Sequence, residues 1–109
     1  MSIRQNCPCT ETCPLQHTME MIGGKWKLPI LCSLTMNGST RYNDLKRKLG
    51  GISNTMLAKS LKELEEEGLV TRTQYMEVPI RVEYSATERV GSLIPILVQL
   101  AQWAVRADT

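Results

Sequence analysis

The sequence predicts a mainly helical fold with a small antiparallel β-ribbon. Three observations indicate this fold class. Leucines recur at helical spacing in short segments bounded by glycines, two runs of alternating β-branched and aromatic residues follow, and another segment of helical spacing comes last. A chain of 109 residues is long enough for one hydrophobic core. We therefore expect residues 1–12 to form a flexible arm and residues 13–109 to form a single domain.

The first part of the domain is predicted to hold two short helices. Apolar residues follow helical spacing across residues 14–36, with an interruption at Gly23 and Gly24. A proline deep inside a helix removes a backbone hydrogen bond, whereas in the first turn no donor is needed. Pro29 is therefore tolerated if the second helix starts near Trp26.

The middle of the chain predicts two helices joined by a tight glycine turn. Asn43 is expected to cap a helix that ends at the glycines of residues 50–51. Ser53 is expected to cap the next helix, which ends near Gly68. Two helices in this arrangement form a helix-turn-helix. The apolar stripe of the second helix has i, i+4, i+7 spacing and consists of Leu57, Leu61 and Leu64.

The residue pattern then changes from the helical period to the strand period. Residues 69–75 and 80–85 are predicted to form antiparallel strands around the Pro-containing loop of residues 76–79. A β-ribbon that follows a helix-turn-helix gives the winged form of that motif. The expected fold is thus a winged helix-turn-helix with added N- and C-terminal helices. Thr87 is expected to cap the last helix, with a kink at Pro95.

The last predicted helix is more apolar than a solvent-facing tail should be. An apolar stripe of this length favours burial against a partner subunit. We therefore expect this helix to lie against a partner subunit. The candidate interface residues are Leu15, Met19, Ile94, Leu97, Leu100, Ala101, Trp103 and Ala104.

Positive charge is concentrated in the middle of the chain, although the whole chain has a formal net charge of only +2. Residues 23–60 carry seven Lys and Arg against one Asp, whereas residues 61–109 carry five against eight Asp and Glu. This asymmetry indicates an anionic partner for one surface. Because no run of about 18 apolar residues occurs and the N-terminus lacks an apolar segment, we expect a soluble, cytoplasmic protein without a membrane partner.

The helix that starts after Ser53 is predicted to present a short, cationic face to DNA. With its leucines toward the core, Thr55, Lys59 and Lys62 point outward, and no carboxylate interrupts this face before Glu66. Asn, Ser, Thr and Lys side chains bind base edges and phosphates in a major groove. The free N–H groups at the helix start also favour phosphate. The candidate DNA-binding residues are Arg41, Lys46, Ser53, Asn54, Thr55, Lys59, Lys62, Arg72, Gln74 and Arg81.

Some of these candidate DNA-binding residues lie outside the recognition helix, on the predicted ribbon and on the preceding helix. Arg72, Gln74 and Arg81 lie at alternating positions on the strands, so they are expected to share one face. Arg47 and Lys48, beside Lys46, are either ordinary surface charges or further phosphate contacts.

Motifs along nearly the whole chain from Cys13 resemble a known family. They are Cys13-Pro14, IGGKW at residues 22–26, RYNDLKRKLGGIS at 41–53, LKELEEEGLV at 61–70 and VPIRVEYSATE at 78–88. With the apolar last helix, they resemble the HxlR-type winged helix-turn-helix transcriptional regulators, a MarR-like group. The resemblance implies a homodimeric, sequence-specific regulator, expected to be a repressor, on a pseudopalindromic double-stranded DNA site near a promoter. It places DNA contacts on Ser53, Asn54, Thr55, Lys59 and the ribbon near Arg81.

The N-terminal cysteines are candidates for redox sensing. The resemblance draws attention to Cys13, because family members with a cysteine at that place respond to electrophiles, oxidants or quinones. Cys13 also precedes the first predicted helix, and thiolates are favoured at helix N-termini. Cys7 and Cys9 leave open which thiol reacts. Cys32 lies inside an apolar helical segment and is expected in the core.

Metal binding by the same cysteines is a weaker alternative. Cys9, Cys13 and His17 follow one another at four-residue spacing, and Cys7 is a fourth donor. Two prolines in this stretch disfavour one continuous helix, and the spacing differs from that of zinc knuckles. We therefore predict neither a metal site nor a cofactor.

Three other functions stay open. A winged helix used only for protein contact would have an apolar recognition surface and weak, salt-insensitive DNA affinity. A regulator that answers a small molecule bound between the terminal helices would need no reactive thiol. A thiol enzyme is disfavoured because the chain has no CxxC motif, a single His and no phosphate-binding loop. We therefore predict that the protein is not an enzyme.

Overall fold

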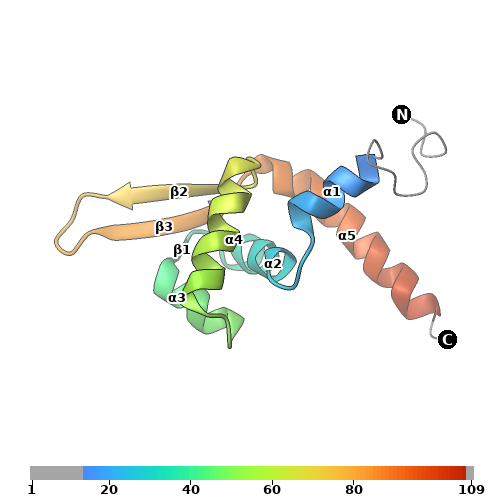
Figure 1. The fold of residues 1–109 in the computed structure, drawn as a ribbon, viewed down its shortest axis with the longest axis horizontal. Helices are drawn as coiled ribbons and strands as arrows, with labels where there is room; N and C mark the ends of the chain where they lie inside the picture. Colours follow the sequence, from blue (N-terminus) through green and yellow to red (C-terminus); the bar gives the residue numbers. More distant parts are fainter. Residues whose placement is uncertain (1–13, 108–109) are drawn as a thin grey trace.

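The computed structural model describes residues 14–107, in which the chain forms five helices and three strands (Figure 1). The predicted arm of residues 1–12 lies outside this part. The mainly helical fold with a small antiparallel sheet is confirmed. In chain order the elements are α1 (Pro14–Ile22), α2 (Lys27–Asn37), β1 (Thr40–Arg41), α3 (Tyr42–Leu49), α4 (Asn54–Glu66), β2 (Val70–Tyr75), β3 (Arg81–Ala86) and α5 (Glu88–Ala107).

The strands form one antiparallel sheet in the order β1-β3-β2. β2 and β3 make a ribbon that projects from one side of the helices, whereas α5 extends on the other side (Figure 1). In the same view α4 lies between the ribbon and the turn that joins α1 to α2. This arrangement is the winged helix-turn-helix, with α1 and α5 added at its ends.

The hydrophobic core lies where the helices meet the base of the sheet. The leucine stripe of α4 is buried as predicted, and Leu57 and Leu64 are fully enclosed. Leu61 completes the stripe, and the other buried apolar residues come from the remaining four helices, from β2 and β3, and from the turns before α4 and β2. They are Met21, Ile22, Ile30, Leu31, Leu34, Leu45, Ile52, Leu69, Val70, Tyr84 and Val90.

The first turn of α2 confirms one prediction, and the exposure of Cys32 corrects another. α2 begins at Lys27, so Pro29 occupies its first turn, where no backbone donor is needed. The buried side of the helix is formed by Ile30, Leu31 and Leu34. Cys32 is two positions from both Ile30 and Leu34, a rotation of roughly 200° around the helix. Its side chain is therefore exposed, and the prediction that it lies in the core is wrong.

A two-residue strand that the sequence analysis missed sets the start of α3. Thr40 and Arg41 pair with β3. This pairing holds Arg41 in an extended conformation, with φ −71° and ψ 152°, at the N-cap of α3. The helix therefore begins at Tyr42, and Asn43 is its second residue rather than its cap.

Both ends of α4 are fixed by neighbouring groups. Gly50 closes the preceding helix with a φ of 58°. Ser53 is the N-cap of α4, as predicted, and its Oγ accepts a hydrogen bond of 3.1 Å from the Met56 amide. At the other end, the guanidinium of Arg89 donates to the Glu67 carbonyl. A cation at this position suits the negative end of the helix dipole.

Among the described residues, the contacts of α5 with the core come from its first half. Thr87 immediately precedes it and donates its hydroxyl to the Gly68 carbonyl at 2.7 Å, which ties α5 to the end of α4. Val90 is buried, with 1% of its surface exposed. Pro95 lies within the helix, as predicted. None of the described helices is both long enough and apolar enough to cross a membrane.

Candidate DNA-binding surface

The side of α4 opposite the leucine stripe is exposed and has no carboxylate before Glu63. We call this surface, together with the exposed residues Ser53 and Asn54 at the N-terminal tip of the helix, the recognition face. Its members are all exposed, and they are Ser53, Asn54, Thr55, Lys59 and Lys62. The structure thus places five of the predicted site residues on one helix and its N-cap.

Tyr42 holds the start of α4 against α3. Its hydroxyl donates to the Asn54 carbonyl at 3.2 Å and lies 3.4 Å from Asn54 Oδ1. Burial of this hydroxyl, and then the neighbouring Tyr84, raise the pKa of Tyr42 above its ordinary value. The hydroxyl therefore remains a protonated donor. The sequence analysis missed Tyr42 because its contact with Asn54 depends on how the two helices pack.

The carboxylate of Glu63 on α4 pairs with Lys27 and not with a lysine of the recognition face. Lys27 Nζ lies 3.1 Å from Glu63 Oε1 and donates to the Glu20 carbonyl at 3.3 Å. Its side chain is only 14% exposed, so it joins three helices and offsets the charge of Glu63. Within residues 14–107, Lys59 and Lys62 have no carboxylate at ion-pair distance. The positive charge of the recognition face is therefore not neutralised by this part of the chain.

The register of the ribbon corrects the prediction that Arg72, Gln74 and Arg81 share one face. Gln74 pairs with Val82, and Tyr75 pairs with Arg81. Directly paired residues of antiparallel strands project to the same side of a sheet. Arg72 and Gln74 therefore lie on one face of the ribbon, and Arg81 lies on the other. Spacing along each strand fixes its own alternation but not the register between strands.

The guanidinium of Arg81 is occupied by the ribbon itself. Its Nη2 lies 3.0 Å from Glu77 Oε2, and its Nε lies 3.4 Å from Glu83 Oε2 without hydrogen-bond geometry. The side chain is 27% exposed. Arg72 is exposed and donates to Gln74 Oε1 at 3.3 Å. Arg72 and Gln74 are therefore more accessible to a ligand than Arg81.

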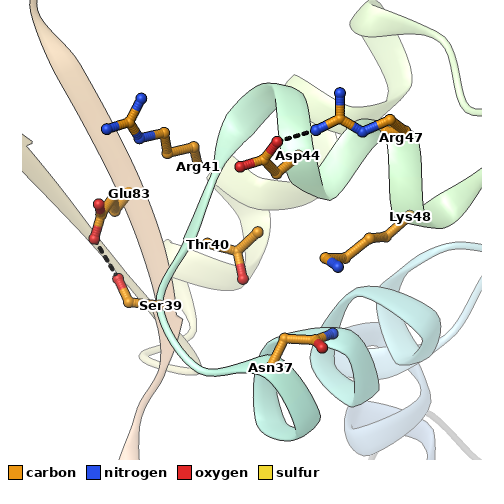
Figure 2. Close-up of a pocket in the computed structure, with 8 residues that line it drawn as sticks. All are labelled: Asn37, Ser39, Thr40, Arg41, Asp44, Arg47, Lys48 and Glu83. Carbon is orange, nitrogen blue, oxygen red and sulfur yellow. Dashed lines mark hydrogen bonds and ion pairs between the residues drawn. The ribbon is translucent and has the colours of Figure 1, made fainter.

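A groove of about 390 Å³ lies beside α3, between the end of α2, β1 and β3 (Figure 2). Figure 2 shows an ion pair between Asp44 and Arg47 and a hydrogen bond of 2.7 Å from Ser39 Oγ to Glu83. Both signs of charge line this groove. Because Asp44 and Glu83 offset part of the positive charge of this groove, it is less suited to an anion than the recognition face.

The flanking basic residues differ in how accessible they are. Arg41 and Lys48 are exposed, whereas Lys46 is half-buried. Arg47 is exposed but paired with Asp44. Arg41 is thus the most accessible flanking cation among those predicted to contact DNA.

The sequence pattern of the HxlR-like helix-turn-helix family matches residues 21–108. This chain belongs to that family. It is 50% identical over 92 residues to the uncharacterized HTH-type transcriptional regulator YkvN of Bacillus subtilis, covering 84% of this chain and 77% of YkvN. Like its relatives, the chain is a helix-turn-helix transcriptional regulator and not an enzyme.

Solved structures agree with this membership. The HxlR-like chain is similar to the crystal structure of ytcD, which is named as an HTH-type transcriptional regulator, with a TM-score of 0.81 and 41% identity. That match covers 87% of this chain and 96% of ytcD. It is also similar to the redox regulator HypR in its oxidized form, with a TM-score of 0.76 and 39% identity over 86% of this chain and 96% of that chain.

The predicted redox residues of this HxlR-like regulator, Cys7, Cys9 and Cys13, lie outside the described residues. His17 is exposed on α1, and its Nδ1 lies 4.0 Å from Glu20 Oε1. Among the described residues, no three His, Cys, Asp or Glu side chains are grouped so that they could hold a metal ion.

The terminal helices of the HxlR-like chain expose much of the predicted dimer interface. Trp103 is 65% exposed, which is unusual for a large apolar side chain without a partner. Ile94 and Leu97 are half-buried, and Ile94 packs against the core. The remaining predicted interface residues are exposed, and they are Leu15, Met19, Leu100, Ala101 and Ala104.

Proposed function

We propose that this HxlR-like regulator binds a pseudopalindromic double-stranded DNA site as a homodimer, with one α4 in each of two successive major grooves. The observation that carries the proposal is the recognition face, which is exposed and has no carboxylate to neutralise its two lysines within the described residues. Such side chains bind base edges and displace counterions from phosphates. In the dimer the two α4 helices would lie roughly 34 Å apart.

Each part of the surface has a distinct role in this proposal. Asn54 and Thr55, at the start of α4, are short enough to approach base edges. Lys59 and Lys62 reach phosphates or guanine. The side chains beside the DNA major groove come from β1, α3 and the ribbon. They are Arg41, Lys46, Arg72 and Gln74.

The dimer in this proposal is formed by α1 and α5. These two helices expose more apolar surface than is usual for helices that face only water. Burying Leu100 and Trp103 against the same residues of a second copy gives a self-complementary interface, which twofold symmetry requires. The proposal requires that the two recognition faces of this dimer point toward one DNA duplex.

Regulation in this proposal acts through the N-terminus. A dimer bound beside a promoter blocks transcription from it, so the protein acts as a repressor in this proposal. Its site of action in this proposal is the cytoplasm. HypR, to which this chain is similar, is described as a redox regulator and was solved in an oxidized form. By analogy, a small external two-electron oxidant would convert the Cys13 thiolate to a sulfenic acid, or to a disulfide with a second thiol, and would itself be reduced. Either product would change the distance between the two α4 helices.

Selection of binding sites from a random pool of DNA duplexes tests the proposal. We expect enriched sites with two inverted half-sites whose centres are about one helical turn apart, roughly 10 base pairs. Footprints of the full-length protein should cover both half-sites. Enrichment of no sequence, together with affinity that does not change with salt concentration, would overturn the assignment to DNA.

A second candidate function is suggested by the tip of the ribbon. Three apolar side chains there are strongly exposed, Met76 at 83%, Val78 at 101% and Ile80 at 58%. An exposed apolar cluster of this kind favours contact with another protein. If the ribbon serves that role, replacing Met76 and Ile80 by Ser will leave DNA affinity unchanged and abolish regulation in cells.

A further inference from the structure

A second cationic surface lies beside the recognition face, on the side away from the ribbon. A groove of about 370 Å³ runs between α4 and the turn that joins α1 to α2. The turn contributes Lys25 and Trp26 to this groove, and α4 contributes Met56 and Lys59. Figure 1 shows α4 between the ribbon and this turn. The recognition helix is therefore flanked by projecting structure on both sides.

The charges in this groove leave two cations without a carboxylate partner. Glu63 also lines the groove, but its carboxylate lies 3.1 Å from Lys27 Nζ. Lys25 is exposed, and its Nζ lies 5.0 Å from the centre of the Trp26 ring. Across residues 14–107, neither Lys25 nor Lys59 has a carboxylate within ion-pair distance. The groove therefore presents net positive charge to whatever lies against α4.

The position of this groove around α4 indicates which part of a bound DNA duplex the groove would face. Lys59 belongs both to the recognition face and to the groove wall, and Met56 lies roughly 60° farther around the helix. A helix with side chains is about 10–12 Å across and nearly fills a major groove about 12 Å wide. Protein structure on either side of α4 must therefore lie against the sugar–phosphate backbone at the edge of the major groove.

We propose that the α1–α2 turn is a DNA-backbone contact, in which Lys25 binds a phosphate of the strand on the side of α4 away from the ribbon. This inference rests on the proposed function. Gly24, with a φ of 93°, gives the turn a conformation that favours glycine, and the ring of Trp26 lies beneath the Lys25 ammonium. The contact reads no sequence, because a phosphate is the same at every base pair.

The salt dependence of binding to a mixed-sequence DNA duplex tests this contact without knowledge of the operator. Lys25→Gln should lower the slope of log affinity against log salt by about 0.9 for each protomer, because one phosphate contact is lost. Lys25→Arg should restore the slope. Arg106→Gln removes one positive charge near the end of α5 and serves as the matched control once sedimentation shows that it is still a dimer, with an unchanged slope expected.

Three outcomes separate this contact from the proposed function. If Lys59→Gln lowers the slope but Lys25→Gln does not, the turn makes no contact and the function of α4 stands. An equal fall in Lys25→Gln and Arg106→Gln would also overturn the contact, because net charge alone would explain it. If the unmodified protein shows no salt-dependent binding, the proposed function and the contact both fail.

Neutralising single phosphates of a selected site locates the contact. Methylphosphonate at one position in each half-site, on the strand beside the α1–α2 turn, should weaken binding of the unmodified protein. The same replacement should leave the affinity of Lys25→Gln unchanged, because its contact is already absent. Equal losses for both proteins at every position would overturn the proposal.

Discussion

Tyr75 and Arg81 lie directly opposite each other in the β2–β3 pairing, and the guanidinium carbon of Arg81 lies 4.1 Å from the centre of the Tyr75 ring. Arg81 also lies within ion-pair distance of Glu77 and Glu83. These contacts stabilise the ribbon. We therefore predict that Arg81→Gln lowers the free energy of unfolding by about 1 kcal/mol. Urea denaturation measures this change.

The same variant tests which ribbon residue contacts DNA. Arg72 lies on the other face of the ribbon and is exposed, so Arg72→Gln should lower the salt slope of DNA binding with little effect on unfolding. Arg81→Gln should leave that slope unchanged. The opposite pattern would show that Arg81 leaves Glu77 and Glu83 when DNA binds and contacts the DNA instead.

The cap of α4 allows stability and DNA binding to be separated at Ser53. Ser53→Ala removes the acceptor for the Met56 amide and should cost about 1 kcal/mol of stability. Ser53→Asp keeps an acceptor at this position, so stability should be retained. Its negative charge would repel phosphates by about 1 kcal/mol in each half-site, which lowers the affinity of a dimer tenfold or more. Thermal unfolding and a DNA titration of both variants check this, and tight DNA binding by Ser53→Asp would exclude a phosphate near the helix start.

The elements of the fold were largely predictable because their signals are local. The leucine stripe of α4 and the serine before it depend only on spacing within the helix and on the chemistry of its first turn. β1 was not predictable, because two residues show no alternation and its strand identity comes from pairing with β3. Cys32 was misplaced because apolar residues occur on several sides of this segment, so the sequence does not show which side of the helix faces the core.

The candidate site was predictable along one helix and less so between elements. Thr55 and Lys59 share a face because of helical geometry alone. The separation of Arg72 from Arg81 depends on strand register, and the hydrogen bond from Tyr42 to Asn54 depends on the packing of α3 against α4. Lys25 was recognised only as part of a motif, since its closeness to α4 arises from the position of the α1–α2 turn.

Charge reversal at Lys59 is the most direct test of the recognition face. Lys59 is exposed and makes no ion pair within the described part of the chain, so Lys59→Glu should fold normally and still form a dimer. Its DNA affinity should fall by more than that of Lys59→Gln, because repulsion is added to the loss of attraction. Filter binding at several salt concentrations, with sedimentation to confirm the dimer, measures both effects. Unchanged affinity in Lys59→Glu would remove α4 from the DNA interface.

Thiol control is tested by comparing Cys13 with Cys32. Cys13→Ser should bind DNA like the unmodified protein but lose any release from DNA after treatment with diamide. Cys32 has an exposed side chain on α2, so Cys32→Ser is the control for thiol modification elsewhere. Loss of the diamide response in Cys32→Ser, with a normal response in Cys13→Ser, would transfer the sensing role to α2. The readout is the shift of a labelled DNA duplex on a native gel.

The outer half of α5 provides the test of the dimer. Trp103 is 65% exposed, and the core contacts of α5 come from its first half, so Trp103→Glu should leave the protomer folded. A charge on an apolar interface resists burial, which should convert the dimer to a monomer. Gln102→Glu adds the same charge at the next position and should remain dimeric. Analytical ultracentrifugation measures the change in mass, and the monomer should lose most of its affinity for a two-half-site duplex, because the second half-site is no longer bound at high effective concentration. A Trp103→Glu protein that sediments as a dimer would show that the two copies meet through a different surface.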